Sequence, residues 1–380
     1  MNNVCTISVG VKAPLIKEGD DIVKIVVSSV LDSTFCVSSG LDKMYDLQDG
    51  DIIGITESVI ARSQGNYVTI DDIAKEIKRL YGEDAVIDVI EPIYSRNRFA
   101  MILKGIARGC KGVRILMPEY DCVGNVIRNH PFTKMNYDEY YEEICKNEEC
   151  KVEIRRESYY LRHISHLNIL YCGLHDYDKM DEVFERLGIS PNCETSKIYT
   201  LADVFKDKCE YGLLGSNKAT EEKLKLFPRK KNSVINWKLS KGSDTIVKEI
   251  KEKIKETTGY DVHVVVYADG CFKDPVGGIW EFADPVSMVS YTDPEIFEST
   301  PNEIKLKAFI DDYKGKDLSG HIKKEIESKD NLMGKMDSQG TTPRLIRDLV
   351  ASLMDLTSGS GDKGTPIVLV KNYFNNYIKG

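Results

Sequence analysis

One stretch of the sequence, from Asp261 to Asp284, constrains the fold and the chemistry of this chain more than any other. It begins with the run D-V-H-V-V-V-Y-A, which is typical of a buried β-strand, and continues as a loop rich in glycine and aspartate. Asp269 stands at the end of that strand, and a carboxylate held there suits a metal or a metal–phosphate group. The loop adds Asp274, Glu281 and Asp284. The alternative is a surface turn whose acids are solvated or cap a helix.

The composition is that of an ordinary globular protein. The 380 residues are enough for two domains or one large one, and 42% apolar with 29% charged residues fits that class. The net charge of −8 gives bulk electrostatics that favour neither nucleic acid nor an anionic membrane. No apolar run has the length of a membrane span, and no signal-peptide pattern is evident. Scattered cysteines without a C-x-x-C pair predict reduced thiols in a cytoplasmic protein.

Strand and helix signals are mixed along the chain without a strict βαβ repeat. Predicted strands cover residues 4–11, 52–55, 113–117, 262–266 and 367–370. Predicted helices cover residues 22–31, 69–81, 98–107, 137–145, 179–187, 201–208, 243–257 and 343–356. Asp21 and Ser243 are expected to cap two of these helices, and Gly259 to end one. This mixture favours an α+β architecture.

Residues 49–65, D-G-D-I-I-G-I-T-E-S-V-I-A-R-S-Q-G, form the second informative segment. A strand runs into Thr56, and a helical turn then carries Arg62 near its end. Hydroxyl groups after a strand, with a cation nearby, bind phosphate in many proteins. The alternative is a helix cap followed by a solvated arginine.

A glycine-rich segment, G-S-G-D-K-G-T at residues 359–365, precedes the last predicted strand. Its glycines let backbone N–H groups approach a phosphate. It is not a P-loop, because no lysine directly precedes Thr365 and a strand follows instead of a helix. The alternative is a hairpin turn without a ligand.

Several of these segments, in the same order along the chain, resemble the coenzyme F-420-0:L-glutamate ligases, a γ-glutamyl ligase family. Residues 268–275 resemble S-D-T-F-G-R-P with one residue inserted, and residues 49–65 resemble D-G-D-x-x-x-x-T-S-K-x-x-S-K-x-E-G. Residues 13–21, 212–217, 312–320 and 359–365 resemble four further family segments, which contain P-G-D-D-L, G-V-D-x-S-N, D-Y-R-G-x-x-D-x-x-G and M-G-x-A-x-G-x-P. The resemblance covers residues 10–124 and 211–371.

The resemblance implies a nucleotide site and a metal site. GTP is the implied co-substrate and Mg²⁺ or Mn²⁺ the implied metal. The implied nucleotide-binding residues are Pro14, Leu15, Ile16, Lys17, Thr56, Arg62, Asn217, Gly359, Ser360 and Gly361. The implied metal ligand is Asp269, with Asp274 and Asp284 as further candidates; no catalytic side chain is assigned.

The chain also departs from the family pattern. Leu214, Gly270 and Ser360 stand where the family has aspartate, threonine and glutamine at its metal positions, and leucine cannot ligate an ion. Glu57 and Ser58 replace a Ser-Lys pair, which reverses a charge. Three hypotheses follow: a nucleotide-dependent ligase, a non-catalytic relative that binds a nucleotide or another metabolite, and an interaction protein.

As a ligase, the chain would join glutamate to a small-molecule carboxylate, in a GTP-dependent amide (γ-glutamyl) bond formed through an acyl phosphate. The resemblance implies two intimately joined α+β domains in a homodimer. Residues 1–124 and 211–380 would be the N-terminal and C-terminal parts of the ligase-like fold. Residues 125–210 have no recognised counterpart, so we expect an insertion that packs as a peripheral subdomain.

Overall fold

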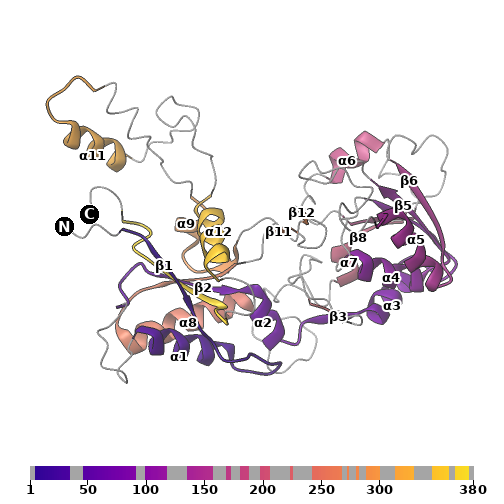
Figure 1. The fold of residues 1–380 in the computed structure, drawn as a ribbon, viewed down its shortest axis with the longest axis horizontal. Helices are drawn as coiled ribbons and strands as arrows, with labels where there is room; N and C mark the ends of the chain where they lie inside the picture. The colour runs from indigo at the N-terminus through magenta and orange to yellow at the C-terminus, as the bar shows by residue number, and fades with distance from the viewer. Residues whose placement is uncertain are drawn as a thin grey trace.

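The computed structural model describes residues 5–34, 46–90, 99–117, 135–156, 168–172, 180–187, 197–205, 223–225, 242–267, 272–273, 280–281, 288–299, 313–328, 345–358 and 364–375. These residues form two lobes, each built on a five-stranded sheet (Figure 1). The first lobe contains elements from both ends of the chain, and the second lobe contains elements from its middle.

The sheet of the first lobe is mixed and has the strand order β1-β14-β2-β10-β13. Its strands are β1 (Ile7–Val11), β2 (Ile52–Thr56), β10 (His263–Tyr267), β13 (Met288–Tyr291) and β14 (Ile367–Lys371). Strands β2 and β10 are parallel, whereas β14 runs antiparallel to both β1 and β2. The last strand of the chain therefore lies between two strands from its first 60 residues.

Helices cover both faces of this sheet, so the first lobe has three layers (Figure 1). Helices α1 (Ile22–Thr34) and α8 (Ser243–Thr258) pack on one face, and α9 (Pro294–Phe297) and α12 (Ile346–Ser358) pack on the other. The alternation of a strand explains this: Ile53 and Ile55 face α1 and α8, whereas Ile52 faces α12. Gly54 shares the second face, where a Cβ atom would lie 2.2 Å from the sulfur of Met354.

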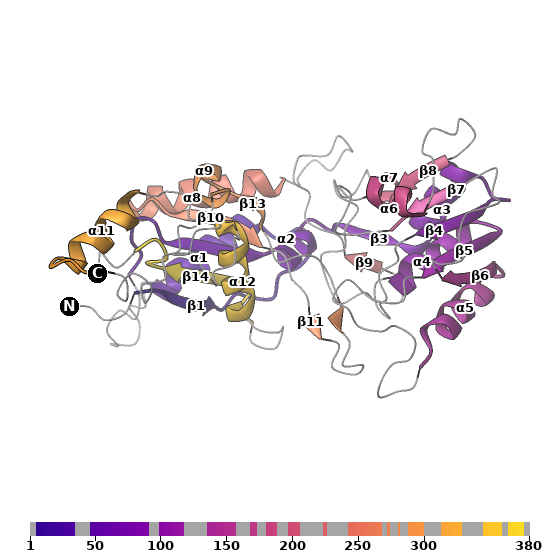
Figure 2. The same cartoon turned by 90° about the horizontal axis from the view of Figure 1, so that it is seen from above.

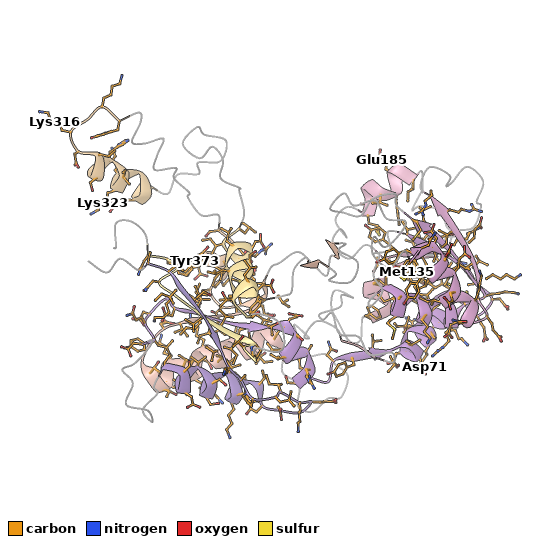
Figure 3. The ribbon with its side chains drawn as sticks, in the orientation of Figure 1. Asp71, Met135, Glu185, Lys316, Lys323 and Tyr373 are labelled. Atoms are coloured by element: carbon orange, nitrogen blue, oxygen red, sulfur yellow. The ribbon has the colours of Figure 1, made fainter. Side chains whose placement is uncertain are left out.

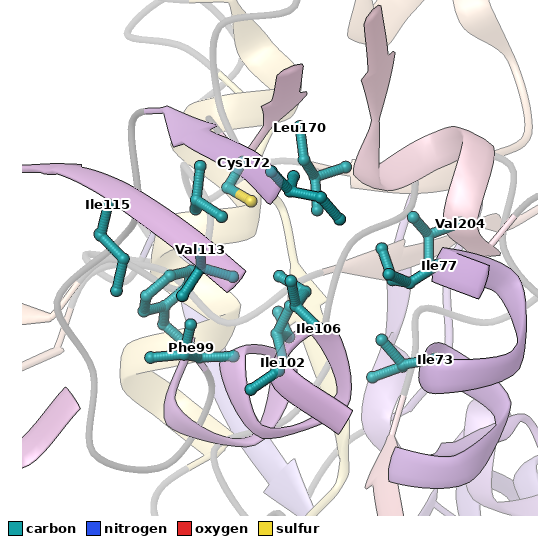
Figure 4. Packing of buried hydrophobic residues seen from close by; sticks show 14 of the residues in the cluster. Ile73, Ile77, Phe99, Ile102, Ile106, Val113, Ile115, Leu170, Cys172 and Val204 are labelled. Carbon is teal, nitrogen blue, oxygen red and sulfur yellow. The ribbon is translucent and has the colours of Figure 1, made fainter. Parts of the chain in front are cut away.

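The second lobe is a parallel sheet with the order β6-β5-β4-β7-β8. Its strands are β4 (Val86–Ile90), β5 (Gly112–Met117), β6 (Lys151–Arg156), β7 (Asn168–Tyr171) and β8 (Lys197–Thr200). One face is covered by α3 (Ile70–Tyr81), α4 (Phe99–Gly109), α5 (Tyr137–Asn147) and α7 (Leu201–Phe205). Helix α6 (Met180–Leu187) covers the other face. Figure 4 shows the larger of these two cores, in which Ile73, Ile102 and Val113 come together from a different element each.

The second lobe differs from what the sequence predicts for residues 125–210. Strands β6, β7 and β8 come from that range and extend the sheet of β4 and β5 through regular parallel registers. The short helices predicted there are present as α5, α6 and α7. The strands escape detection because β6 has only two apolar residues among six, and β7 and β8 have four residues each. That residues 125–210 are an insertion relative to the family stays a prediction, as do the domain boundaries.

The remaining elements are short. Helix α2 (Glu57–Ser63) follows β2, and β3 (Tyr67–Thr69) pairs with β9 (Lys223–Lys225) between the lobes (Figure 2). Strands β11 (Phe272–Lys273) and β12 (Trp280–Glu281) form a two-stranded ribbon. Helix α11 (Leu318–Ser328) lies away from both sheets, in the part marked by Lys316 and Lys323 in Figure 3.

The start of α11 explains the motif at residues 312–320 as a local structure. The hydroxyl of Tyr313 donates to the carbonyl of Asp317 at 2.8 Å, and Asp317 Oδ1 accepts from the backbone of Gly320 at 2.8 Å. A Cβ atom at Gly320 would lie 2.1 Å from the Asp317 carboxylate. The described residues of this motif therefore support one another without a ligand.

The helix caps follow the sequence in two of three cases. Asp21 Oδ1 accepts from the backbone of Lys24 at 3.0 Å at the start of α1, and Gly259 ends α8 with a φ of +81°. Ser243, expected as the cap of α8, is its first helical residue, and Gly242 is the N-cap. The Ser243 hydroxyl is buried and hydrogen-bonded to Ser290 at 2.6 Å, so it joins the helix to β13.

Candidate functional site

Four segments that the sequence singles out meet at one end of the first sheet. Strands β2 and β10 are parallel and end side by side, with Thr56 opposite Tyr267. Strand β14 runs the other way, so its first residue, Ile367, lies opposite both Ile55 and Val11. The chain therefore leaves β1, β2 and β10, and enters β14, at the same end. In the sequence, Asp269 follows β10 by two residues.

The loop after β1 is fixed at both of its ends and exposed in its middle. The backbone N–H of Ala13 donates to Gly364 O at 3.0 Å, and that of Gly19 donates to Ser63 O at 2.9 Å. Within the loop, Lys17 N donates to Asp20 Oδ2 at 2.6 Å. Among the nucleotide-binding residues that the resemblance implies in this loop, Ile16 is buried, whereas Pro14, Leu15 and Lys17 are exposed. This is an anchored loop that can present backbone groups to a ligand.

Thr56 and Glu57 lie where β2 passes into α2. The backbone N–H of Thr56 donates to Pro366 O at 3.0 Å, which joins the ends of β2 and β14. Its hydroxyl donates to Glu57 Oε2 at 3.0 Å. Glu57 is fully buried in the first turn of α2, where the helix dipole favours a negative charge. The sequence marks this glutamate only as a charge reversal, whereas the structure buries it where β2 passes into α2.

Arg62 is an exposed cation in the last turn of α2. Burial raises the pKa of Tyr67, while the positive charge of Arg62 opposes that shift and the negative charge of Glu18 adds to it. Arg62, Glu18 and Tyr67 are thus close enough to influence one another. A Cβ atom at Gly65 would lie 2.4 Å from Glu18 Oε1, so the loop after β1 packs directly on the turn that follows α2. This contact places the exposed loop and Arg62 beside each other.

The first half of the 49–65 segment has a structural role at the opposite end of the sheet. Asp49 Oδ1 accepts from the backbone of Asp261 at 2.7 Å, and Gly50 N donates to Asp261 O at 2.9 Å. Asp51 Oδ2 lies 2.6 Å from Lys371 Nζ. The D-G-D sequence therefore joins the beginnings of β2 and β10 to the end of β14.

A charged network that sequence analysis missed lies at this opposite end. Asp293 accepts from Lys251 Nζ at 2.8 Å and is bonded to His263 Nδ1 at 2.7 Å. Asp293 also has a φ of +58°, which is uncommon for a non-glycine residue. Burial alone would raise its pKa, but hydrogen bonds from Lys251, Thr292 and His263 outweigh burial and lower the pKa to about 2. No sequence pattern links these residues, because they come from three elements.

Several predicted site residues lie outside the described residues. These are Asn217, Gly359, Ser360, Gly361, Asp269, Asp274 and Asp284, together with Leu214 and Gly270. Their assignments stay predictions. Among the described residues, no group of three histidine, cysteine, aspartate or glutamate side chains is placed to hold a metal ion. None of the helices in this part of the chain combines the length and the apolar character needed to cross a bilayer.

Comparison with known proteins decides the family. The model of the F420-0:Gamma-glutamyl ligase family matches residues 10–372. The chain belongs to this family. The match includes all four segments that meet at the end of the first sheet, and it extends across residues 125–210. No curated protein matches the sequence significantly. Family membership agrees with the mixed α+β fold and indicates ligase-type chemistry on small-molecule substrates.

Proposed function

We propose that this protein is a nucleotide-dependent γ-glutamyl ligase whose nucleotide binds at the end of the first sheet. The terminal phosphoryl group of GTP is transferred to a carboxylate oxygen of a small acceptor, which forms an acyl phosphate. The amine of glutamate attacks the acyl carbon, loses a proton and displaces phosphate, leaving an amide. The observation that carries this proposal is the convergence of β1, β2, β10 and β14 at one sheet end.

The described residues have distinct roles in this proposal. The anchored loop at residues 14–17 offers backbone groups to the nucleotide, and Arg62 neutralises phosphate charge. Thr56 and Glu57 form a fixed pair of oxygen donors at the end of β2. Phosphoryl transfer depends mainly on such positioning and on cations near the phosphates, so no described side chain is required as a nucleophile.

The proposed site takes Mg²⁺ or Mn²⁺ together with the nucleotide. The buried carboxylate of Glu57 and the hydroxyl of Thr56 are hard oxygen donors, which fit these ions. Two such groups are too few to hold an ion alone, so Asp269 and phosphate oxygens complete the proposed set. The metal supplies charge neutralisation when it is bound. In this proposal, Glu57 makes up for a carboxylate lost at Leu214.

We further propose that the protein acts as a cytoplasmic homodimer. Light scattering at micromolar concentration tests the oligomeric state, and a monomer would contradict it. This part of the proposal is independent of the nucleotide site.

Calorimetric titration tests the nucleotide site. We expect GTP to bind the wild-type protein in the presence of Mn²⁺, and Arg62→Ala to weaken binding about tenfold, as expected for one charge-assisted contact. Arg79→Ala is the matched control, because Arg79 lies on α3 in the second lobe, where it pairs with Glu76 at 2.7 Å. Equal affinity of all three proteins for GTP would show that the nucleotide does not bind at this end of the sheet. Binding of GTP without glutamate-dependent turnover of any carboxylate acceptor would favour a non-catalytic relative.

A further inference from the structure

Three cysteines gather at one corner of the second lobe, far in the fold from the proposed nucleotide site. Cys110 directly follows α4, Cys145 lies in α5, and Cys150 directly precedes β6. Cys145 and Cys150 are buried, and Cys110 is partly exposed. The proposed ligase chemistry uses none of them. The proposed function therefore gives no reason for this cluster of thiols.

Cys110 lies two residues before β5 and Cys150 lies one residue before β6, and these two strands are neighbours in the sheet. Gly112 and Lys151 are partners in the parallel register of β5 and β6. One step earlier, Lys151 N donates to Lys111 O at 3.1 Å, so pairing continues to the residues beside both cysteines. Cys110 Sγ donates to Gly112 O at 3.4 Å, and Cys150 Sγ donates to Lys151 O at 3.5 Å. The two sulfurs therefore lie against the carbonyls of residues that are partners in this register.

The two thiols are also in contact. Cys110 and Cys150 are joined by a side-chain hydrogen bond, and this bond is the largest influence on the pKa of each. It lowers the pKa of Cys150, which burial opposes and the backbone of Val113 supports. The same bond raises the pKa of Cys110, and burial adds to that shift. Cys145 is fully buried and burial raises its pKa, so that thiol is shielded from external disulfides.

We propose that Cys110 and Cys150 are a reversible disulfide-forming pair. Cys110, the partly exposed thiol, loses its proton and attacks one sulfur of a small disulfide such as oxidised glutathione, and the released glutathione thiolate takes up a proton. Cys150 then loses its proton and attacks Cys110 Sγ in the mixed disulfide, and the second glutathione leaves as a thiolate that takes up a proton. Two protein thiols are oxidised and one small disulfide is reduced. The product is a single Cys110 Sγ–Cys150 Sγ bond.

This bond would join the end of α4 to the start of β6 and close a loop that contains α5. A cross-link of this kind stabilises a fold mainly by restricting the unfolded chain. The second lobe should therefore unfold at a higher temperature when oxidised, by about 5 °C or more. The nucleotide site lies in the other lobe, so its affinity for GTP should not change.

Peptide mapping of the full chain tests the pair. The protein is equilibrated with reduced and oxidised glutathione, free thiols are blocked with N-ethylmaleimide, and unreduced peptides are identified by mass. We expect a peptide linked through Cys110 and Cys150 in the wild type and in Cys5→Ser, a control at an exposed cysteine. The linkage should be absent from Cys110→Ser. A wild-type protein alkylated at both positions under oxidising conditions, or linked through Cys145 instead, would overturn the proposal.

Thermal unfolding gives a second readout that does not depend on peptide recovery. The oxidised wild type should melt above its reduced form, whereas Cys110→Ser should melt at the same temperature in both buffers. An equal oxidation-dependent shift in wild type and Cys110→Ser would contradict a stabilising bond at this position. Because the wild type is compared with itself, the test holds even where a variant is less stable.

Discussion

The ammonium nitrogen of Lys371 lies 2.6 Å from Oδ2 of Asp51, and both side chains are almost completely buried. Lys371 also donates to the backbone carbonyl of Asp46, and Asp51 Oδ2 accepts from the backbone of Gln48 at 2.9 Å. The pair joins the last residue of β14 to the turn before β2, across 320 positions of sequence. It helps to fix the register of β14 against β2.

Removing one member of this pair should be costly. Lys371→Met leaves the Asp51 carboxylate buried without its cation, so we expect a loss of about 3–5 kcal/mol in the free energy of unfolding of the first lobe. Lys78→Met is the control, because the Lys78–Glu83 pair is exposed and should contribute less than about 1 kcal/mol. Chemical denaturation followed in each variant measures both values. A small effect for Lys371→Met would show that the pair does not hold the sheet together.

The network around Asp293 should make stability depend on acidity. The pKa of Asp293 is about 2 in the folded protein, below its ordinary value of 3.8. The carboxylate therefore stabilises the fold above about pH 4, and this contribution is lost as the pH falls from about 4 towards 2. Since water screens a partly exposed network, we expect about 1 kcal/mol at neutral pH.

Asp293→Asn tests this dependence. The variant should be less stable than the wild type at pH 7, and the difference should narrow between about pH 4 and pH 2. Denaturation at a series of pH values measures the difference. A constant difference across this range would mean that ionisation of Asp293 is not its source.

Alanine substitutions at two glycines distinguish the effect of backbone strain from the effect of displacing the loop at residues 14–17. Gly65 and Gly50 have φ values of +58° and +80°, so alanine is strained at both, at about 1 kcal/mol. Only at Gly65 would the new Cβ atom collide with Glu18, at 2.4 Å; at Gly50 it meets nothing within 4 Å. Gly65→Ala should therefore weaken GTP binding, whereas Gly50→Ala should lose stability and keep its affinity. Calorimetry on both variants checks this, and equal affinities would mean that the 14–17 loop does not contact nucleotide.

Most of the first lobe follows from the sequence. Apolar periodicity predicts α1, α3, α8 and α12, and buried runs predict β2, β10 and β14 to within a few residues. The strand before Asp269 is found because Val264 to Tyr267 form a run of four apolar residues after the glycine that ends α8, and all four are buried. The apolar sequence pattern identifies a strand most clearly where both faces of that strand are buried.

Pairing between distant segments could not be predicted in this way. Nothing in the sequence near Lys371 indicates that β14 inserts between β1 and β2, because that placement depends on contacts across the whole chain. The burial of Glu57 is likewise decided by the elements that surround it rather than by its neighbours in sequence. Strands β6 and β7 were missed because an edge strand and a four-residue strand carry too little pattern.

Manganese titration with and without GTP tests the central claim most directly. Asp269 follows β10 at the end of the sheet where the four segments meet, and one carboxylate binds Mn²⁺ weakly without further oxygen donors. For the wild type, the account predicts weak Mn²⁺ binding alone and at least tenfold tighter binding with GTP. For Asp269→Asn, it predicts that the gain from GTP is lost. Equal Mn²⁺ affinity in all four titrations would contradict a nucleotide–metal site at this end of the sheet.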